Sequence, residues 1–287
     1  MSADRNIAIA FRGDGNRLAL GSPSRELILW DTSSPGRPVQ MGALSGGGGI
    51  TVAAWNPAAV ALLATISADG SVAGWRVVDD RPPQLTATMP GSRERPQHLA
   101  WLSEGKRLFG ATSVGHITVW DTDGTPRARR GRSIEGLVIA AYGWASATVL
   151  VSHLGHLEMW NPATQFAKSR LLTGRVVASA HSGSLLALAH EDGLIEIVDH
   201  ELERVAGIRH RAPAPAALAF SEDSRALVVA ATDGSLTALG ADRDIWWHRP
   251  GDGTPPAAMA VASGLIAVVG NRGHVTILRM ADGSEAG

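Results

Sequence analysis

Seven copies of one sequence pattern follow each other along this chain, and each copy ends on a large apolar anchor residue. Successive anchors lie 38 to 45 residues apart, at Trp30, Trp75, Trp120, Trp160, Val198, Leu239 and Leu278. A glycine lies five residues before every anchor except the first, where Arg25 stands instead. A period near forty that fills a chain of 287 residues indicates a repeat protein in which each copy is one supersecondary unit.

The copies have the pattern of short β-strands. Residues of the anchor segment alternate between two faces, as Ile117 and Val119 do against Thr118 and Trp120. Two further apolar runs precede each anchor segment, and a less regular run follows most anchors, at 39–44, 84–89, 204–208 and 244–249. The glycine before the anchor often follows an aspartate, and Asp-Gly is typical of hairpin turns that need positive φ. Each copy therefore predicts four antiparallel strands.

Four strands per copy, repeated seven times, predict an all-β fold: a seven-bladed β-propeller of four-stranded antiparallel blades. No segment has the apolar period of an amphipathic helix. Because a single blade cannot bury its apolar faces alone, we expect residues 1–287 to form a single domain.

Two dipeptides at the anchors resemble those of the WD40-repeat family, namely Trp30-Asp31 and Trp120-Asp121, and two more are degenerate, Trp75-Arg76 and Trp160-Asn161. The turns at Asp69-Gly70, Asp192-Gly193 and Asp233-Gly234 are similar to the turn before that family's third strand. The family's Gly-His dipeptide before the first strand is missing, so we expect the hydrogen-bond network of that His to be incomplete. The resemblance implies a WD40-like propeller that holds protein partners, and the Arg-rich, Ala-rich composition is similar to that of bacterial members.

The seventh copy is shorter than the others. Only RMADGSEAG follows Leu278, and this segment is not strand-like. We expect three good strands and a poor fourth, with residues 1–6 or 279–285 supplying a short irregular strand. Alternatively, the unpaired edge accepts a strand from another chain.

Composition excludes several function classes. The chain has no cysteine, which excludes disulfides, thiolate zinc sites and a cysteine nucleophile. The formal net charge of −1 predicts no general attraction to nucleic acid or to an anionic membrane. No signal peptide and no transmembrane run is recognisable, so we expect a cytoplasmic protein without a membrane role.

The ten histidines do not form a recognisable site. His116, His156 and His274 recur at one repeat position, which places them on different blades, and His153 and His190 fall in loops before third strands. No catalytic or phosphate-binding motif occurs, so we expect no enzyme, metal or cofactor. The alternative is a propeller enzyme or small-ligand binder with its site at the channel mouth near His181.

Charge is distributed unevenly along the chain. Residues 81–175 contain 12 Lys or Arg against 6 Asp or Glu, while the other blades carry acidic residues such as Asp192, Glu196, Glu201 and Glu203. We predict that the basic connections contact an acidic protein surface, through Arg93, Arg95, Arg129, Arg130 and Arg132. Nucleic acid is not expected there, because no aromatic residue accompanies these arginines for base stacking.

Loop tips before the third strands provide further candidate contact residues. They carry Ser113, His153, Glu191, Thr232 and Asn271. Trp246 and Trp247 are adjacent in a predicted strand, so they point to opposite faces and one should be exposed. We assign Trp247 as that exposed contact residue.

Taken together, the pattern predicts a non-catalytic scaffold or sensor module that binds proteins, as a subunit or recognition part of a larger bacterial assembly. Nothing in the sequence indicates a homo-oligomer.

Overall fold

The computed structural model describes residues 8–22, 25–45, 49–79, 81–89, 96–102, 104–112, 116–130, 143–144, 148–153, 156–161, 164, 167–182, 185–210, 213–242, 244–270 and 273–286. All regular structure in these residues is β-strand, which confirms the all-β class. No helix in this part of the chain is long and apolar enough to cross a membrane.

Residue contacts divide the chain into two units. The first unit comprises Met1–Ser33 and Pro38–Ser169, and the second comprises Ser34–Arg37 and Arg170–Gly287. We describe each unit by itself, and the assignment of 1–287 to one domain stays a prediction.

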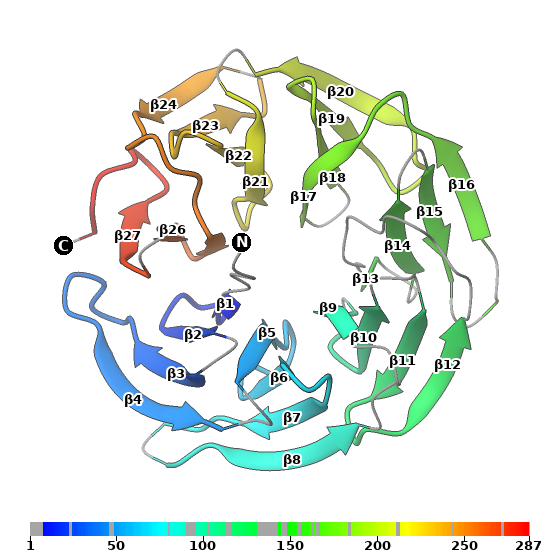
Figure 1. Ribbon diagram of the computed structural model, residues 1–287, viewed down its shortest axis with the longest axis vertical. Helices are drawn as coiled ribbons and strands as arrows, with labels where there is room; N and C mark the ends of the chain where they lie inside the picture. Colours follow the sequence, from blue (N-terminus) through cyan, green and yellow to red (C-terminus); the bar gives the residue numbers. More distant parts are fainter. Residues whose placement is uncertain are drawn as a thin grey trace. The chain divides into compact units, whose positions relative to one another are not determined.

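The first unit contains four antiparallel sheets, and each sheet is formed by four strands that follow each other in sequence (Figure 1); the last two residues of the sixteenth strand, Arg170 and Leu171, belong to the second unit. The strands are β1 (Ala8–Phe11), β2 (Arg17–Ser22), β3 (Arg25–Asp31), β4 (Val39–Leu44), β5 (Ile50–Trp55), β6 (Leu62–Ser67), β7 (Val72–Arg76), β8 (Gln84–Met89), β9 (Pro96–Trp101), β10 (Arg107–Thr112), β11 (Ile117–Asp121), β12 (Pro126–Arg130), β13 (Gly143–Trp144), β14 (Thr148–His153), β15 (His156–Trp160) and β16 (Ala167–Leu171). This up-and-down order is that of a propeller blade.

The second unit contains two four-stranded sheets and one three-stranded sheet among its described residues. Its strands are β17 (Val176–Ser182), β18 (Leu185–His190), β19 (Leu194–Val198), β20 (Arg204–Arg209), β21 (Pro215–Phe220), β22 (Ala226–Ala231), β23 (Leu236–Gly240), β24 (Ile245–Arg249), β25 (Ala258–Ala262), β26 (Leu265–Val269) and β27 (Val275–Arg279).

The prediction of seven four-stranded blades was therefore wrong in one blade. Six described sheets have four strands, and the sheet of β25, β26 and β27 has three. After β27 the chain turns at Gly283, and residues 284–286 return to the sheet through an isolated bridge between Leu278 and Glu285 and through hydrogen bonds from Arg279 N to Ser284 O and from Ala286 N to Ile277 O. This short pairing agrees with the expected irregular strand within residues 279–285.

The repeat anchors occupy the places that the sequence predicts. All seven lie on the third strand of a sheet, and most are buried. The turn glycines that the structure describes before these strands have positive φ, at Gly70, Gly193, Gly234 and Gly273. Positive φ costs glycine little, which explains why the repeat keeps it there.

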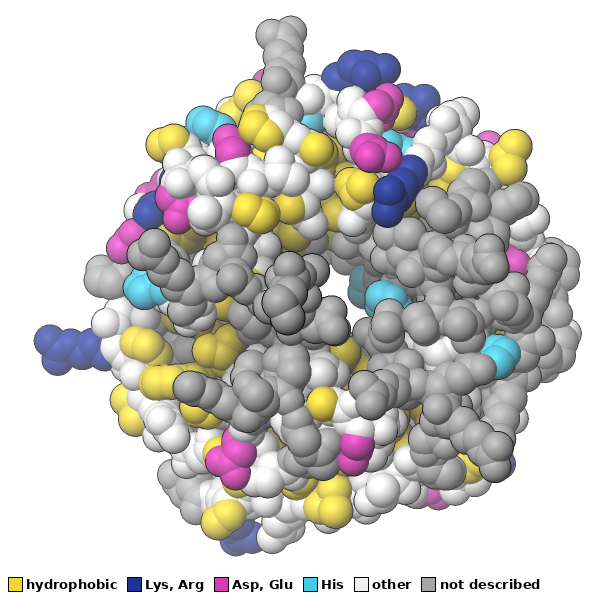
Figure 2. Space-filling model, viewed as in Figure 1, with side chains coloured by type: hydrophobic (Ala, Val, Ile, Leu, Met, Phe, Trp, Pro, Cys, Tyr) yellow, Lys and Arg dark blue, Asp and Glu magenta, His cyan; other side chains and the backbone are white. Residues whose placement is uncertain are grey.

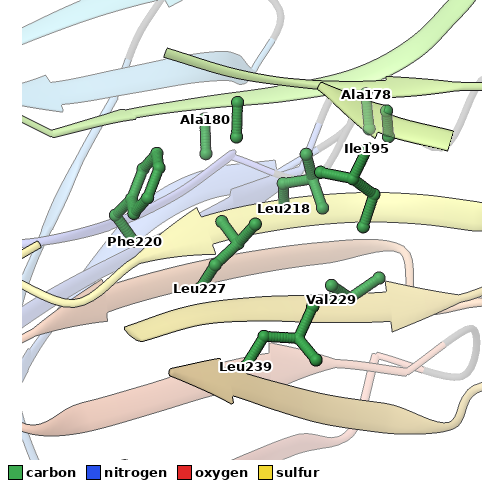
Figure 3. Close-up of a cluster of buried hydrophobic side chains, with 10 residues drawn as sticks. Ala178, Ala180, Ile195, Leu218, Phe220, Leu227, Val229 and Leu239 are labelled. Carbon is green, nitrogen blue, oxygen red and sulfur yellow. The ribbon is translucent and has the colours of Figure 1, made fainter. Parts of the chain in front are cut away.

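Apolar side chains from neighbouring sheets form the core within each unit. In the second unit, β17, β18 and β19 pack on β21, β22 and β23, and Figure 3 shows the side chains of this cluster pointing toward one another. Ala178, Ala180, Ala187 and Ala189 contribute to it, so the small residues of one sheet meet larger residues such as Phe220 and Leu227 of the next. Alternation of small and large residues lets the sheets interlock at high density.

Two tryptophans join neighbouring sheets of the first unit through the backbone. Trp55 Nε1 donates to Ala10 O at 3.1 Å, and Trp101 Nε1 donates to Ala54 O at 2.9 Å. Each indole ends the first strand of its sheet and bonds the first strand of the preceding sheet. The repeat therefore has a second recurring packing contact besides its anchors, at Trp55 and Trp101.

Candidate protein-interaction surfaces

The outermost strands of five sheets share one irregularity. In each of them the pairing with the third strand skips a residue next to the repeat anchor, as where Ala238 pairs with Trp247 but Leu239 pairs with Ile245. Such a β-bulge sets two residues against one and reorients the side chains around it. The extra residues are Met41, Thr86, Arg127, Val205 and Trp246. All five are exposed, so the repeat presents one outward side chain per bulge.

The bulge in β24 decides which of two adjacent tryptophans is exposed. Ile245 and Trp246 are 64% and 47% exposed, whereas Trp247 is only 9% exposed. Our assignment of Trp247 as the exposed contact residue was therefore wrong, because simple alternation does not hold across a bulge. The exposed indole is Trp246, and it lies against Gly240, where an added Cβ would be 2.3 Å from Nε1.

Two predicted loop-tip residues lie at the same end of neighbouring sheets in the second unit. Glu191 follows β18 and Thr232 follows β22, and both are exposed. Glu191 helps to line a cavity of about 330 Å³, together with Thr173, Gly174, Arg175, His190, Asp192 and Leu194. Ser113 and Asn271 lie outside the described residues, as does the side chain of His153. Contact roles for these tips stay predictions.

The predicted basic contact residues are mostly outside the described part of the chain. Arg93, Arg95 and Arg132 lie outside it, and only the backbone of Arg129 and Arg130 is described, where β12 pairs with Thr118 and Ile117. The neighbouring Arg127 has a described side chain, which is exposed and paired with the Asp121 carboxylate. Over the described part of the face in Figure 2, hydrophobic side chains lie between scattered charged ones.

A buried ion cluster in the second unit was missed by the sequence reasoning. The carboxylate of Glu196 is 3% exposed; it accepts a hydrogen bond from Arg170, and its second oxygen lies 3.5 Å from His190 Nε2. Arg204 Nε lies 4.0 Å from the oxygen that Arg170 contacts. We had placed Glu196 on an acidic surface and His190 in a loop, but both are buried on strands. Third strands are covered on both faces by neighbouring sheets, so a polar residue there is not necessarily exposed.

Three histidines of the sequence hypotheses that the structure describes lie in different surroundings. His274 is exposed, His181 lies on β17 with an exposed side chain, and His190 is buried beside Glu196. Within the described residues, no group of three or more His, Asp or Glu side chains is placed to hold a metal ion.

Comparison with known proteins identifies the fold only. No family model and no curated protein matches the chain. Among solved structures, a chain of the "Crystal Structure of Mitotic Checkpoint Complex" matches with a TM-score of 0.65 at 18% identity, over 82% of this chain and 75% of that chain. At this identity the likeness supports the β-propeller fold alone.

Proposed function

We propose that this protein is a non-catalytic protein-interaction module, which serves as a scaffold or sensor subunit of a larger bacterial assembly in the cytoplasm. The observation that carries the proposal is the adjacent pair Ile245 and Trp246, which the bulge of β24 turns outward together. Exposed tryptophan is the side chain that most often anchors protein interfaces, and an apolar neighbour enlarges its contact area.

The architecture supports the same function. Blades of this kind are rigid, and their loops and outer strands offer several separate surfaces to partners. The solved chain that matches this one is part of a checkpoint complex, which makes participation in an assembly a reasonable expectation for this fold.

The basic segments form a second part of the proposal. Arg93, Arg95, Arg129, Arg130 and Arg132 contact an acidic surface of the partner, and the loop tips His153, Glu191, Thr232 and Asn271 add polar contacts. Charge reversal at Arg129, Arg130 and Arg132 should weaken that complex, and an unchanged complex would remove these residues from the interface.

The test begins with a tagged chain isolated from its native host at moderate salt, followed by mass spectrometry of the proteins that co-purify. The purified partner is then titrated against the Trp246→Ala variant. We expect about 30-fold weaker binding, the loss typical of an interface tryptophan.

Val205→Ala is the matched control, since Val205 is the exposed bulge residue of the neighbouring sheet. It should bind within about twofold of the unaltered chain. Absence of any stoichiometric partner, or equal binding by the Trp246→Ala variant, would overturn the proposal.

A further inference from the structure

An apolar groove lies in the first unit between β4 and the connection from β7 to β8. Its volume is about 610 Å³, which lies in the range of sites that hold small ligands. Val39, Met41, Val78, Pro82 and Pro83 contribute apolar surface to it. Val39 is 63% exposed, Met41 38% and Val78 40%, so large apolar side chains here face solvent.

The groove is built by features that hold its walls in place. Met41 is the bulge residue of β4, and both it and Val39 are exposed. Pro83 lies beside β4 at Gly42, where an added Cβ would make an ordinary van der Waals contact of 3.7 Å with Pro83 Cδ. The two prolines have fixed φ and no N–H, so this wall is stiff and offers no backbone donor.

Two charged residues line the groove, and only one of them is available to a partner. Asp31 accepts a hydrogen bond from Ser33 N at 2.9 Å and pairs with Arg17 at 3.0 Å. Arg81 is exposed and makes no ion pair with any described residue. The groove therefore combines apolar walls with one uncompensated cation.

The backbone of β4 adds a third element. β4 is the last strand of its sheet in the described structure, and an edge strand can pair with an extended segment. A chain that lies along this edge places alternate side chains toward the groove, because strand side chains alternate.

We propose that this groove binds an extended segment of a protein partner, which inserts one apolar side chain between Val39, Met41 and Val78 and places a carboxylate at Arg81. The inference rests on the proposed interaction function and names a second surface with its own ligand chemistry. A nucleic acid is a poorer fit, since the groove has one free cation and no aromatic side chain for stacking.

The probe for the test is a phage-displayed library of random linear peptides of about seven residues, selected on the full chain. We expect selected peptides to share a large apolar residue close to Asp or Glu. Binding of the synthesised peptides is then measured with the Arg81→Glu and Met41→Glu variants, and each should weaken it by about tenfold or more.

Arg225→Glu is the matched control, because Arg225 is an exposed arginine of the other unit and its reversal should leave peptide binding unchanged. A second measurement uses the absence of cysteine: in a Val39→Cys variant the only thiol lies at the groove. A bulky maleimide on that thiol should block the peptides, whereas the unlabelled variant should bind them.

The outcomes separate the two proposals. Peptides without an acidic residue, or peptides that bind the Arg81→Glu variant and the labelled Val39→Cys variant normally, overturn the groove assignment. If a native partner nevertheless binds through Trp246, the proposed interaction function is retained. Conversely, if peptides bind specifically at the groove but no native partner co-purifies, the proposed function is overturned and the binding site is retained.

Discussion

The indole Nε1 of Trp247 donates a 2.7 Å hydrogen bond to the main-chain carbonyl of Met280. Both residues are buried, and they belong to the apolar cluster shared by the sheet of β24 and the sheet of β27. The three-stranded sheet is thus joined to its neighbour by a side chain from the neighbour's outermost strand. Trp247 has a structural role, although it is adjacent to the exposed Trp246.

The two tryptophans should differ strongly in their effect on stability. Trp247→Ala removes a buried ring and its hydrogen bond, so we expect the free energy of unfolding to fall by about 3–5 kcal/mol. Trp246→Ala should cost about 1 kcal/mol or less, since much of that ring is already in water. Urea denaturation of both variants measures the difference, and equal losses would contradict the burial assigned here.

Gly283 should resist substitution more strongly than another glycine with a similar backbone. Its φ is +69°, and an added Cβ would lie 2.7 Å from Trp247 Cε3. Gly264 has a φ of +73° but nothing within 4 Å of the Cβ position, so Gly264→Ala carries only the backbone cost, about 1 kcal/mol. We expect Gly283→Ala to lower the melting temperature clearly further than Gly264→Ala. The same melting temperature for both would mean that the indole does not lie against Gly283.

Removal of Arg170 should leave a buried carboxylate without its main partner. We expect Arg170→Met to lower the free energy of unfolding by about 3–5 kcal/mol, because the buried Glu196 carboxylate then loses its ion-pair partner. The double variant Arg170→Met with Glu196→Leu should recover most of this loss, since neither member of this buried ion pair is then left without its partner.

Arg209→Met is the control for that series, because Arg209 and its partner Asp192 are both exposed and 3.7 Å apart. It should change stability by less than about 0.5 kcal/mol. If the double variant were less stable than Arg170→Met alone, the cost of the unpaired carboxylate would not be the cause of the loss.

The turn between β22 and β23 should show a specific pH effect. The pKa of Asp233 is lowered from 3.8, first because the Ser235 hydroxyl donates to its carboxylate and then because Ser235 N does so, at 2.6 and 2.9 Å. A lowered folded-state pKa gives stability that is complete above the ordinary carboxyl pKa and is lost as the pH falls through the folded value.

Ser235→Ala should therefore move the pKa of Asp233 upward, toward 3.8. The loss of stability that protonation of Asp233 causes at low pH should become smaller. A carboxyl carbon NMR titration measures the shift. Asp282 is the internal control, because Ser284 lowers its pKa by the same arrangement and should continue to do so. An unchanged pKa of Asp233 would show that the hydroxyl is not the cause.

Much of the blade architecture could be predicted because the same pattern of strands and turns recurs in every copy of the repeat. Trp120 and Leu239 lie on third strands as their spacing indicates, and Gly193 adopts the positive φ that its Asp-Gly turn requires. The less regular runs at 39–44 and 84–89 form the expected outermost strands. Each of these features depends on local pattern, which one sequence is enough to show.

The candidate surfaces were harder to predict. Trp246 is exposed and Trp247 is buried because the pairing of β24 with β23 passes over Trp246. The types of residue in a strand do not predict where such a bulge occurs. Glu196 is buried because another strand supplies Arg170 to compensate it. The groove at Arg81 depends on how two sheets pack, and no motif marks it.

The sequence by itself determined the all-β repeat, the position of the anchors and the turns between the strands. These follow from side-chain periodicity and backbone preference, which act over a few residues. Only the tertiary structure decided which indole faces solvent and which carboxylate is buried. Burial and compensation of charge depend on contacts between residues that are distant in the chain. The pattern of a single segment does not predict those contacts.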